Sequence, residues 1–121
     1  MLKIFLVDDS APVRTRLEAM LASIAGALIV GQAGDAEAAV RGILDGQPDV
    51  VVLDLKLGEA NGFDVLRALR EAGSQADVYM LSNFATPAYR RRAEQLGARA
   101  FFDKSTEFEH LRTAIAARAG E

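Results

Sequence analysis

The amino-acid sequence predicts an α/β protein built on a parallel sheet that helices cover on both faces. Strand-like and helix-like segments alternate five times along 121 residues, and the connections between them are short. The run VVVL at residues 50–53 is apolar at every position, which is typical of a strand buried on both faces. The length suits one domain with its own core, so residues 1–121 are expected to form a single domain.

Each element follows from a local pattern. The strands are expected at Lys3–Val7, Leu28–Gln32, Val50–Leu53, Val78–Ser82 and Arg99–Phe102. Helices with apolar stripes at helical spacing fill the intervals between and after them. A glycine in the left-handed position is expected to end each helix, at Gly26, Gly46, Gly73, Gly97 and Gly120. Three helices are expected to begin at Asp35, Asn61 and Thr86, and the last at a capping box of Thr106 and Glu109.

The composition excludes several classes of protein. The net charge of −3 does not favour broad binding to nucleic acids or anionic membranes. The chain has no cysteine and therefore no disulfide framework. No apolar run approaches the roughly 20 residues of a membrane span. The N-terminal MLKIFLVDD lacks the cleavage site of a signal peptide. The cytoplasm is the expected compartment.

Polar residues gather where the predicted strands end, which is where parallel sheets bind their ligands. The first strand ends in Asp8-Asp9 and the third in Asp54. The fourth ends in Ser82-Asn83 and the fifth in Asp103-Lys104, whereas the second ends in Ala33-Gly34, which carry no reactive group. If the second strand is an edge, the other four ends converge.

Two adjacent carboxylates need a compensating partner. At about 4 Å they repel by about 1 kcal/mol in water and about 4 kcal/mol at an effective dielectric of 20. A hard cation such as Mg²⁺ resolves this repulsion, and the absence of His and Cys from the cluster argues against zinc. Neighbouring strand residues point to opposite faces, so Asp8 and Asp9 share a site only if the chain has already left the strand. The following Ser10-Ala11-Pro12 permits this.

The other strand-end residues suit a phosphoryl group. The Lys104 ammonium and the Ser82 hydroxyl can bind phosphoryl oxygens. A carboxylate beside a metal can act as the nucleophile and form an acyl phosphate, and Asp54 is the central candidate. Each of these residues taken alone fits a structural role, but their convergence on four strand ends favours phosphoryl transfer onto an aspartate.

With these motifs in place, the chain resembles the receiver domain of two-component response regulators over essentially all 121 residues. The matching motifs are the acidic pair after the first strand, VVLDL, MLSN and FFDKS. The resemblance implies a flavodoxin-like (βα)5 fold of strand order 2-1-3-4-5, an order that the chemotaxis member of this family exemplifies.

The resemblance also implies the roles of individual residues. Asp54 would accept a phosphoryl group from a histidine kinase or phosphotransfer protein. Asp9, Asp54 and the carbonyl of Lys56 would bind Mg²⁺ directly, and Asp8 through water. Ser82 and Lys104 would contact the phosphoryl oxygens, and Phe102 would move with Ser82 as a switch; a plain core-edge ring is the alternative for Phe102.

Three residues depart from the family pattern: Gly58 replaces the usual Pro, Asn83 a small residue, and Ser105 the frequent Pro. The loop after Asp54 is therefore expected to be looser. None of the three is a phosphorylation residue, so an active receiver is expected. It would catalyse only its own phosphorylation and dephosphorylation, and it is not otherwise an enzyme.

Three functional hypotheses remain. In the first, a stand-alone receiver acts on a downstream protein through the face formed by helix 4, strand 5 and helix 5, with a homodimer as one outcome of phosphorylation. The second is the N-terminal receiver of a longer DNA-binding regulator; the absence of a linker after AIAARAGE favours the first. The third, a Mg²⁺-dependent aspartyl phosphatase, requires an acid two residues after the nucleophile, where this chain has Lys56. The run Arg90-Arg91-Arg92 is interpreted as a solvated face, with partner binding as the alternative.

Overall fold

A computed structural model describes all residues, 1–121, as twelve elements. Along the chain these are β1 Leu2–Val7, α1 Ala11–Ala22, β2 Ala27–Ala33, α2 Ala36–Gly46, β3 Val50–Leu53, β4 Lys56–Leu57, β5 Ala60–Asn61, α3 Gly62–Glu71, β6 Asp77–Ser82, α4 Pro87–Gln95, β7 Ala100–Asp103 and α5 Phe108–Ala119. No helix is both long and apolar enough to cross a membrane.

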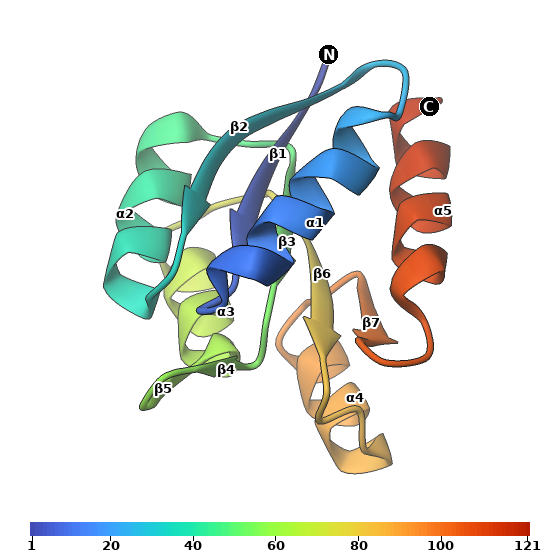
Figure 1. Cartoon of the computed structure of the whole chain (residues 1–121). Coiled ribbons are helices and arrows are strands. Elements are labelled where there is room, and N and C mark those ends of the chain that lie inside the picture. The colour runs from blue at the N-terminus through green and yellow to red at the C-terminus, as the bar shows by residue number, and fades with distance from the viewer.

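Five strands form one parallel sheet in the order β2-β1-β3-β6-β7. Counted by βα unit this is the order 2-1-3-4-5, so the predicted flavodoxin-like fold is confirmed. Helices α1 and α5 cover one face of the sheet, and α2, α3 and α4 cover the other (Figure 1). Strand β2 is an edge, as expected, and all five strands run in the same direction.

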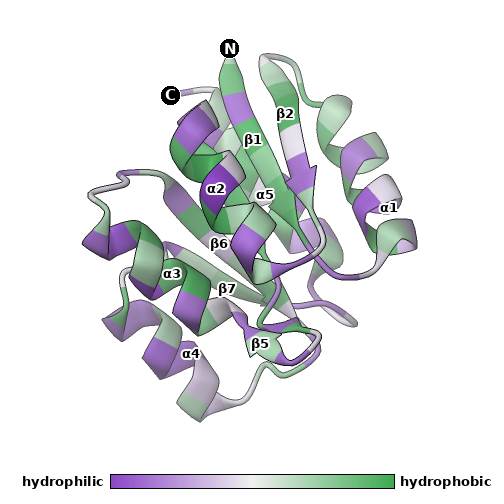
Figure 2. Ribbon diagram, turned by 90° about the vertical axis from the view of Figure 1, so that its left-hand side faces the viewer, coloured by the Kyte–Doolittle hydropathy of each residue, from purple (hydrophilic) through white to green (hydrophobic).

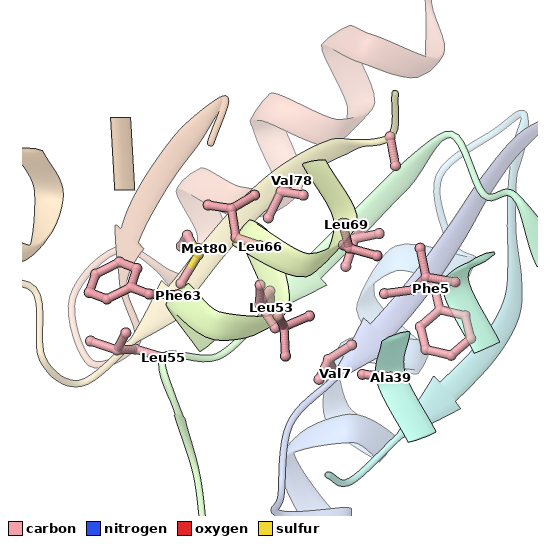
Figure 3. Packing of buried hydrophobic residues seen from close by; sticks show 14 of the residues in the cluster. Phe5, Val7, Ala39, Leu53, Leu55, Phe63, Leu66, Leu69, Val78 and Met80 are labelled. Carbon is pink, nitrogen blue, oxygen red and sulfur yellow. The ribbon is translucent and has the colours of Figure 1, made fainter. Parts of the chain in front are cut away.

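The sheet divides the core into two apolar clusters because successive side chains of a strand point to opposite faces. In β1, Phe5 and Val7 join the cluster under α2, α3 and α4, whereas Ile4 and Leu6 join the one under α1 and α5. Figure 3 shows the first cluster, in which α3 lays its apolar side chains over β3 and β6. In Figure 2 the strands are mostly green, the colour of hydrophobic residues, while the outward faces of the helices are mostly purple, the colour of hydrophilic ones.

Hydrogen-bonding side chains start four of the helices. Asp35, Asn61 and Thr86 are N-caps as predicted, and Ser10 is a fourth, accepting from the Val13 amide at 3.3 Å. The predicted capping box of Thr106 and Glu109 is wrong. Helix α5 begins after Glu107, whose carboxylate does not cap it.

The glycine prediction holds at two helix ends and fails at three. Gly73 and Gly97 directly follow the C-caps of α3 and α4 and have positive φ angles. Gly26 also has a positive φ, but α1 already ends at Ala22, so Gly26 lies in the turn before β2. Gly46 instead is the last residue of α2, and the left-handed position falls on Gln47 with φ 46°. Gly120 has φ −82° and continues the right-handed backbone of α5.

A short antiparallel hairpin, β4–β5, follows β3 and was not predicted. Gly58 turns it at φ 63°, an angle that proline cannot adopt, which gives a physical reason for glycine at this position. Gly62 starts α3 directly against the backbone of Asp54: a Cβ atom there would lie 2.3 Å from the Asp54 carbonyl oxygen. The hairpin and this close approach hold the backbone around Asp54 in place.

Candidate functional site

The strand order brings the four predicted strand ends together at one edge of the sheet. Strands β1 and β3 are neighbours, so Asp54 follows its strand beside Asp8. Strand β6 ends at Ser82, paired with Asp103 of β7, and Lys104 follows directly. The inert end of β2 lies outside this group.

Asp8, Asp9 and Asp54 form one acidic cluster. One carboxylate oxygen from each lies within 4.8 Å of the other two. Asp8 and Asp54 are buried, with 1% and 6% of their surface exposed, whereas Asp9 is exposed. Strand β1 ends at Val7, so the acidic pair has left the strand before the alternation of faces could separate it.

Lys104 is the cation of the pocket. Its Nζ donates to Asp8 Oδ2 and to Asp54 Oδ2, both at 2.8 Å. Burial by itself would lower the pKa of Lys104, but the hydrogen bonds to Asp54 and Asp8 outweigh it and raise the pKa above its usual value. Lys104 is therefore charged at neutral pH.

The Asp54 carboxyl is held in an unfavourable setting for a charge. Burial raises its pKa above the ordinary value of 3.8, the charge of Asp8 raises it further, and the contact with Lys104 only partly offsets both. Three carboxylates face one ammonium, which leaves an excess of negative charge in a partly buried pocket. Oxygen ligands with that excess are the donor set that Mg²⁺ prefers, so the residues present fit such an ion.

The two acids of the pair differ in how their oxygens are used. Asp8 accepts from the Ser10 amide at 2.9 Å through Oδ1 and from Lys104 through Oδ2. Asp9 accepts only a 3.3 Å bond from the Gly58 amide. Asp9 thus has more free lone pairs toward solvent than Asp8 does.

Of the other predicted residues, Ser82 and Phe102 lie beside the cluster and make no hydrogen bond to its carboxylates, whereas Lys56 bonds to one of them through its backbone amide. The Ser82 hydroxyl is fully buried and accepts from the Phe84 amide at 3.1 Å. The backbone carbonyl of Ser82 accepts from the Lys104 amide at 2.9 Å, which links the end of β6 to the loop after β7. Phe102 is partly buried and packs against the cluster under α1 and α5. Lys56 donates its amide to Asp54 Oδ1 at 3.4 Å.

Sequence reasoning missed two contributors. Arg14 in α1 donates to the backbone carbonyl of Asp8 and so helps to fix the acidic pair; its only signal was a basic residue one turn after that pair. Arg90 in α4 was interpreted as part of a solvated run, but it is partly buried and bonded to three segments. Its neighbours Arg91 and Arg92 are exposed, as expected.

Comparison with known proteins identifies relatives of this chain. Residues 4–116 match the family described as the response regulator receiver domain. The chain is 30% identical over 115 residues to an uncharacterized transcriptional regulatory protein, YvfU, of Bacillus subtilis, covering 95% of this chain and 58% of that protein. It is 31% identical to the response regulator GacA of Pseudomonas aeruginosa, covering 95% and 54%. The chain thus spans little more than half the length of these two relatives.

A solved structure of a response regulator has the same fold as this chain. A two-component response regulator of the LuxR family from Aurantimonas superposes with a TM-score of 0.90 at 30% identity, covering 98% of this chain and 84% of that one.

Proposed function

This chain belongs to the receiver domains of response regulators, and on that premise we propose that it accepts a phosphoryl group on Asp54 from a phosphohistidine. The donor would be a sensor histidine kinase or a phosphotransfer protein. The observation that carries the proposal is the contact of Lys104 with a buried Asp54 inside the acidic cluster. A receiver domain is a signalling module rather than a catalytic enzyme, and the aspartyl phosphatase hypothesis is not retained.

The reaction is a phosphoryl transfer from nitrogen to oxygen. An Asp54 carboxylate oxygen attacks the phosphorus, the bond from phosphorus to the donor imidazole breaks, and the imidazole nitrogen takes up a proton. Burial of Asp54 weakens the solvation of its carboxylate, which favours bond formation at that oxygen. Lys104 lies where it can neutralise the oxygens of the arriving phosphoryl group.

The acidic cluster would hold the Mg²⁺ ion that this reaction requires. Asp9, Asp54 and the carbonyl of Lys56 would be its direct protein ligands, and Asp8 would act through water. The ion would neutralise phosphoryl charge that Lys104 alone cannot balance. The exposed Asp9, with its weakly engaged oxygens, supports this division of roles.

Phosphorylation would be read out on a face away from Asp54. The Ser82 hydroxyl would turn to a phosphoryl oxygen, and Phe102 would move with it. The adjacent pairing of Leu81 with Phe102 and of Ser82 with Asp103 supports a coupled movement of these two strands. The surface formed by α4, β7 and α5 would then bind a downstream protein or a second phosphorylated copy. This domain would not contact nucleic acid itself, and the cytoplasm is the compartment that we propose.

A second candidate is the receiver part of a longer transcriptional regulator. The coverage of only 58% of YvfU, a transcriptional regulatory protein by name, favours it. The two candidates share the chemistry at Asp54 and differ only in the output. Sequencing the complete reading frame separates them, because a DNA-binding domain after residue 121 is required by the second alone.

The phosphoacceptor can be tested by intact-mass measurement. Incubation with a small acyl phosphate and Mg²⁺ should add one phosphoryl group to the wild-type protein and none to Asp54→Asn. Asp45→Asn, which removes an exposed carboxylate on α2, is the matched control and should label fully. Full labelling of Asp54→Asn would exclude Asp54 as the acceptor.

A further inference from the structure

Helix α4 is held to the rest of the molecule by few contacts. Ala93 is its only buried residue, and the helix projects past the carboxyl ends of the strands (Figure 1). Arg90 supplies the polar attachment. Its Nε donates to the Ala85 carbonyl at 3.3 Å and its Nη1 to the Phe101 carbonyl at 2.8 Å. Its Nη2 donates to Glu107 Oε1 at 2.7 Å.

Glu107 continues this attachment into the loop that carries Lys104. The same Oε1 atom accepts from the Asp103 amide at 2.9 Å, and the Glu107 amide donates to the Asp103 carbonyl at 2.8 Å. The loop from residue 103 to residue 107 is therefore closed by a backbone bond and by a carboxylate. The Arg90 guanidinium also keeps the pKa of the Glu107 carboxyl below its usual value, so the pair stays charged at neutral pH.

We propose that Arg90 and Glu107 are positioning residues that set where Lys104 lies in the pocket. The inference rests on the proposed phosphoryl transfer to Asp54. Each of the three segments that Arg90 bonds adjoins a site residue. Ala85 lies in the loop after Ser82, and Phe101 directly precedes Phe102 in β7. Glu107 anchors the residue before Lys104. Together they fix the spacing between the loop that bears the hydroxyl and the loop that bears the ammonium.

The geometry of the guanidinium explains why this position needs arginine. Its planar fork donates in three directions at once, whereas a lysine ammonium at residue 90 is a compact charge on a shorter reach. Arg90→Lys keeps the charge and loses the bridge. Lys104 must stay within hydrogen-bonding distance of both Asp8 and Asp54, and a misplacement of about 1 Å can cost about a hundredfold in rate.

The chain offers a matched control for each partner. Arg91→Lys makes the same change one residue along α4, at an exposed side chain that has no ion pair or side-chain hydrogen bond. Glu107→Gln keeps an acceptor oxygen for the Asp103 amide, whereas Glu107→Ala removes it. Rescue by glutamine separates a positioning role from a general loss of stability.

The experiment measures the rate of Asp54 labelling by a small acyl phosphate with Mg²⁺, together with backbone amide exchange by NMR. Arg90→Lys and Glu107→Ala should label roughly ten- to a hundredfold more slowly than wild type. Arg91→Lys should label at the wild-type rate, and Glu107→Gln should recover most of it. The amides of Asp103 and Lys104 should exchange faster in the two slow variants while those of β1 and β3 stay protected.

Wild-type labelling in Arg90→Lys, or equal slowing in Arg91→Lys, would overturn the inference. If the wild-type protein itself does not label, the proposed function fails, and the exchange measurement still decides the positioning role. Unchanged protection of Asp103 and Lys104 in Arg90→Lys would then refute it. Global loss of protection in Arg90→Lys, matched by Glu107→Gln, would refute it as well, since it would make the pair a stability element.

Discussion

Replacing Asp54 with asparagine should stabilise the metal-free protein near neutral pH, although it removes a partner of Lys104. Asp54 and Asp8 have carboxylate oxygens within 4.8 Å, a repulsion of about 3.5 kcal/mol at an effective dielectric of 20. The contact with Lys104 at 2.8 Å contributes about 6 kcal/mol of attraction on the same scale. Desolvation of a buried carboxylate costs several kcal/mol more.

The raised pKa of Asp54 shows that desolvation and the charge of Asp8 outweigh the attraction to Lys104. Because that pKa is raised by burial first and by Asp8 next, the folded protein holds the proton more tightly than the unfolded chain. The stability contribution of Asp54 is therefore greatest below the ordinary pKa of 3.8 and falls as pH rises through the higher folded value. Above that value the ionised group lowers stability by a constant amount.

Thermal unfolding in EDTA measures the effect. We expect a gain of about 1–3 kcal/mol for Asp54→Asn, or about 4 °C per kcal/mol. The gain should shrink in acid, as the pH falls through the raised pKa of Asp54 and the wild-type carboxylate takes up a proton. Glu59→Gln, an exposed acid with no ion pair, is the control and should leave the midpoint unchanged. A lower unfolding temperature for Asp54→Asn than for wild type in EDTA at neutral pH would refute the reasoning. A gain of the same size at neutral and at acid pH would refute it as well.

Two further predictions test the metal site and the core. Asp9→Asn should weaken Mg²⁺ binding more than Asp8→Asn does, because both Asp8 oxygens already accept strong hydrogen bonds; calorimetric titration compares them, and a larger loss in Asp8→Asn contradicts this. Gly42→Ala should lower the free energy of unfolding by about 1–3 kcal/mol, as measured by urea denaturation, although alanine has the better helix propensity. The reason is that the alanine Cβ would lie 2.7 Å from the Phe5 ring. Gly46→Ala in the same helix meets no atom within 4 Å and should not destabilise it.

Much of the fold was readable from the sequence because it depends on local patterns. The consecutive apolar run of β3 and the alternation of strands with helices predict a buried parallel sheet, whatever the order of its strands. N-cap residues such as Asp35 and Asn61 are recognisable because their side chains bond to amides only a few residues away. The chemistry of the strand ends was readable too, since a parallel sheet brings those ends to one edge.

Two local rules failed, one at the start of α5 and one at the end of α2. The predicted capping box of Thr106 and Glu109 fails because the N-cap position of α5 is Glu107, whose carboxylate is bonded to Arg90. The place of the left-handed residue after α2 is Gln47, not Gly46, because the helix runs one residue further than the glycine signal indicates. Neither contact nor helix length is encoded in the nearest few residues.

The sequence by itself determined which residues could form a phosphoryl-transfer site: the acidic pair, Asp54, Ser82 and Lys104. Only the tertiary structure decided how they divide the work. Residues 8 and 104 lie far apart in the chain, so their 2.8 Å contact exists only once the sheet has formed. Arg90 is a second example. Its sequence neighbours Arg91 and Arg92 suggest an exposed charge, but in the fold its guanidinium bonds to three segments. A contact between distant segments depends on the packing of the intervening chain, and for that reason local pattern cannot predict it.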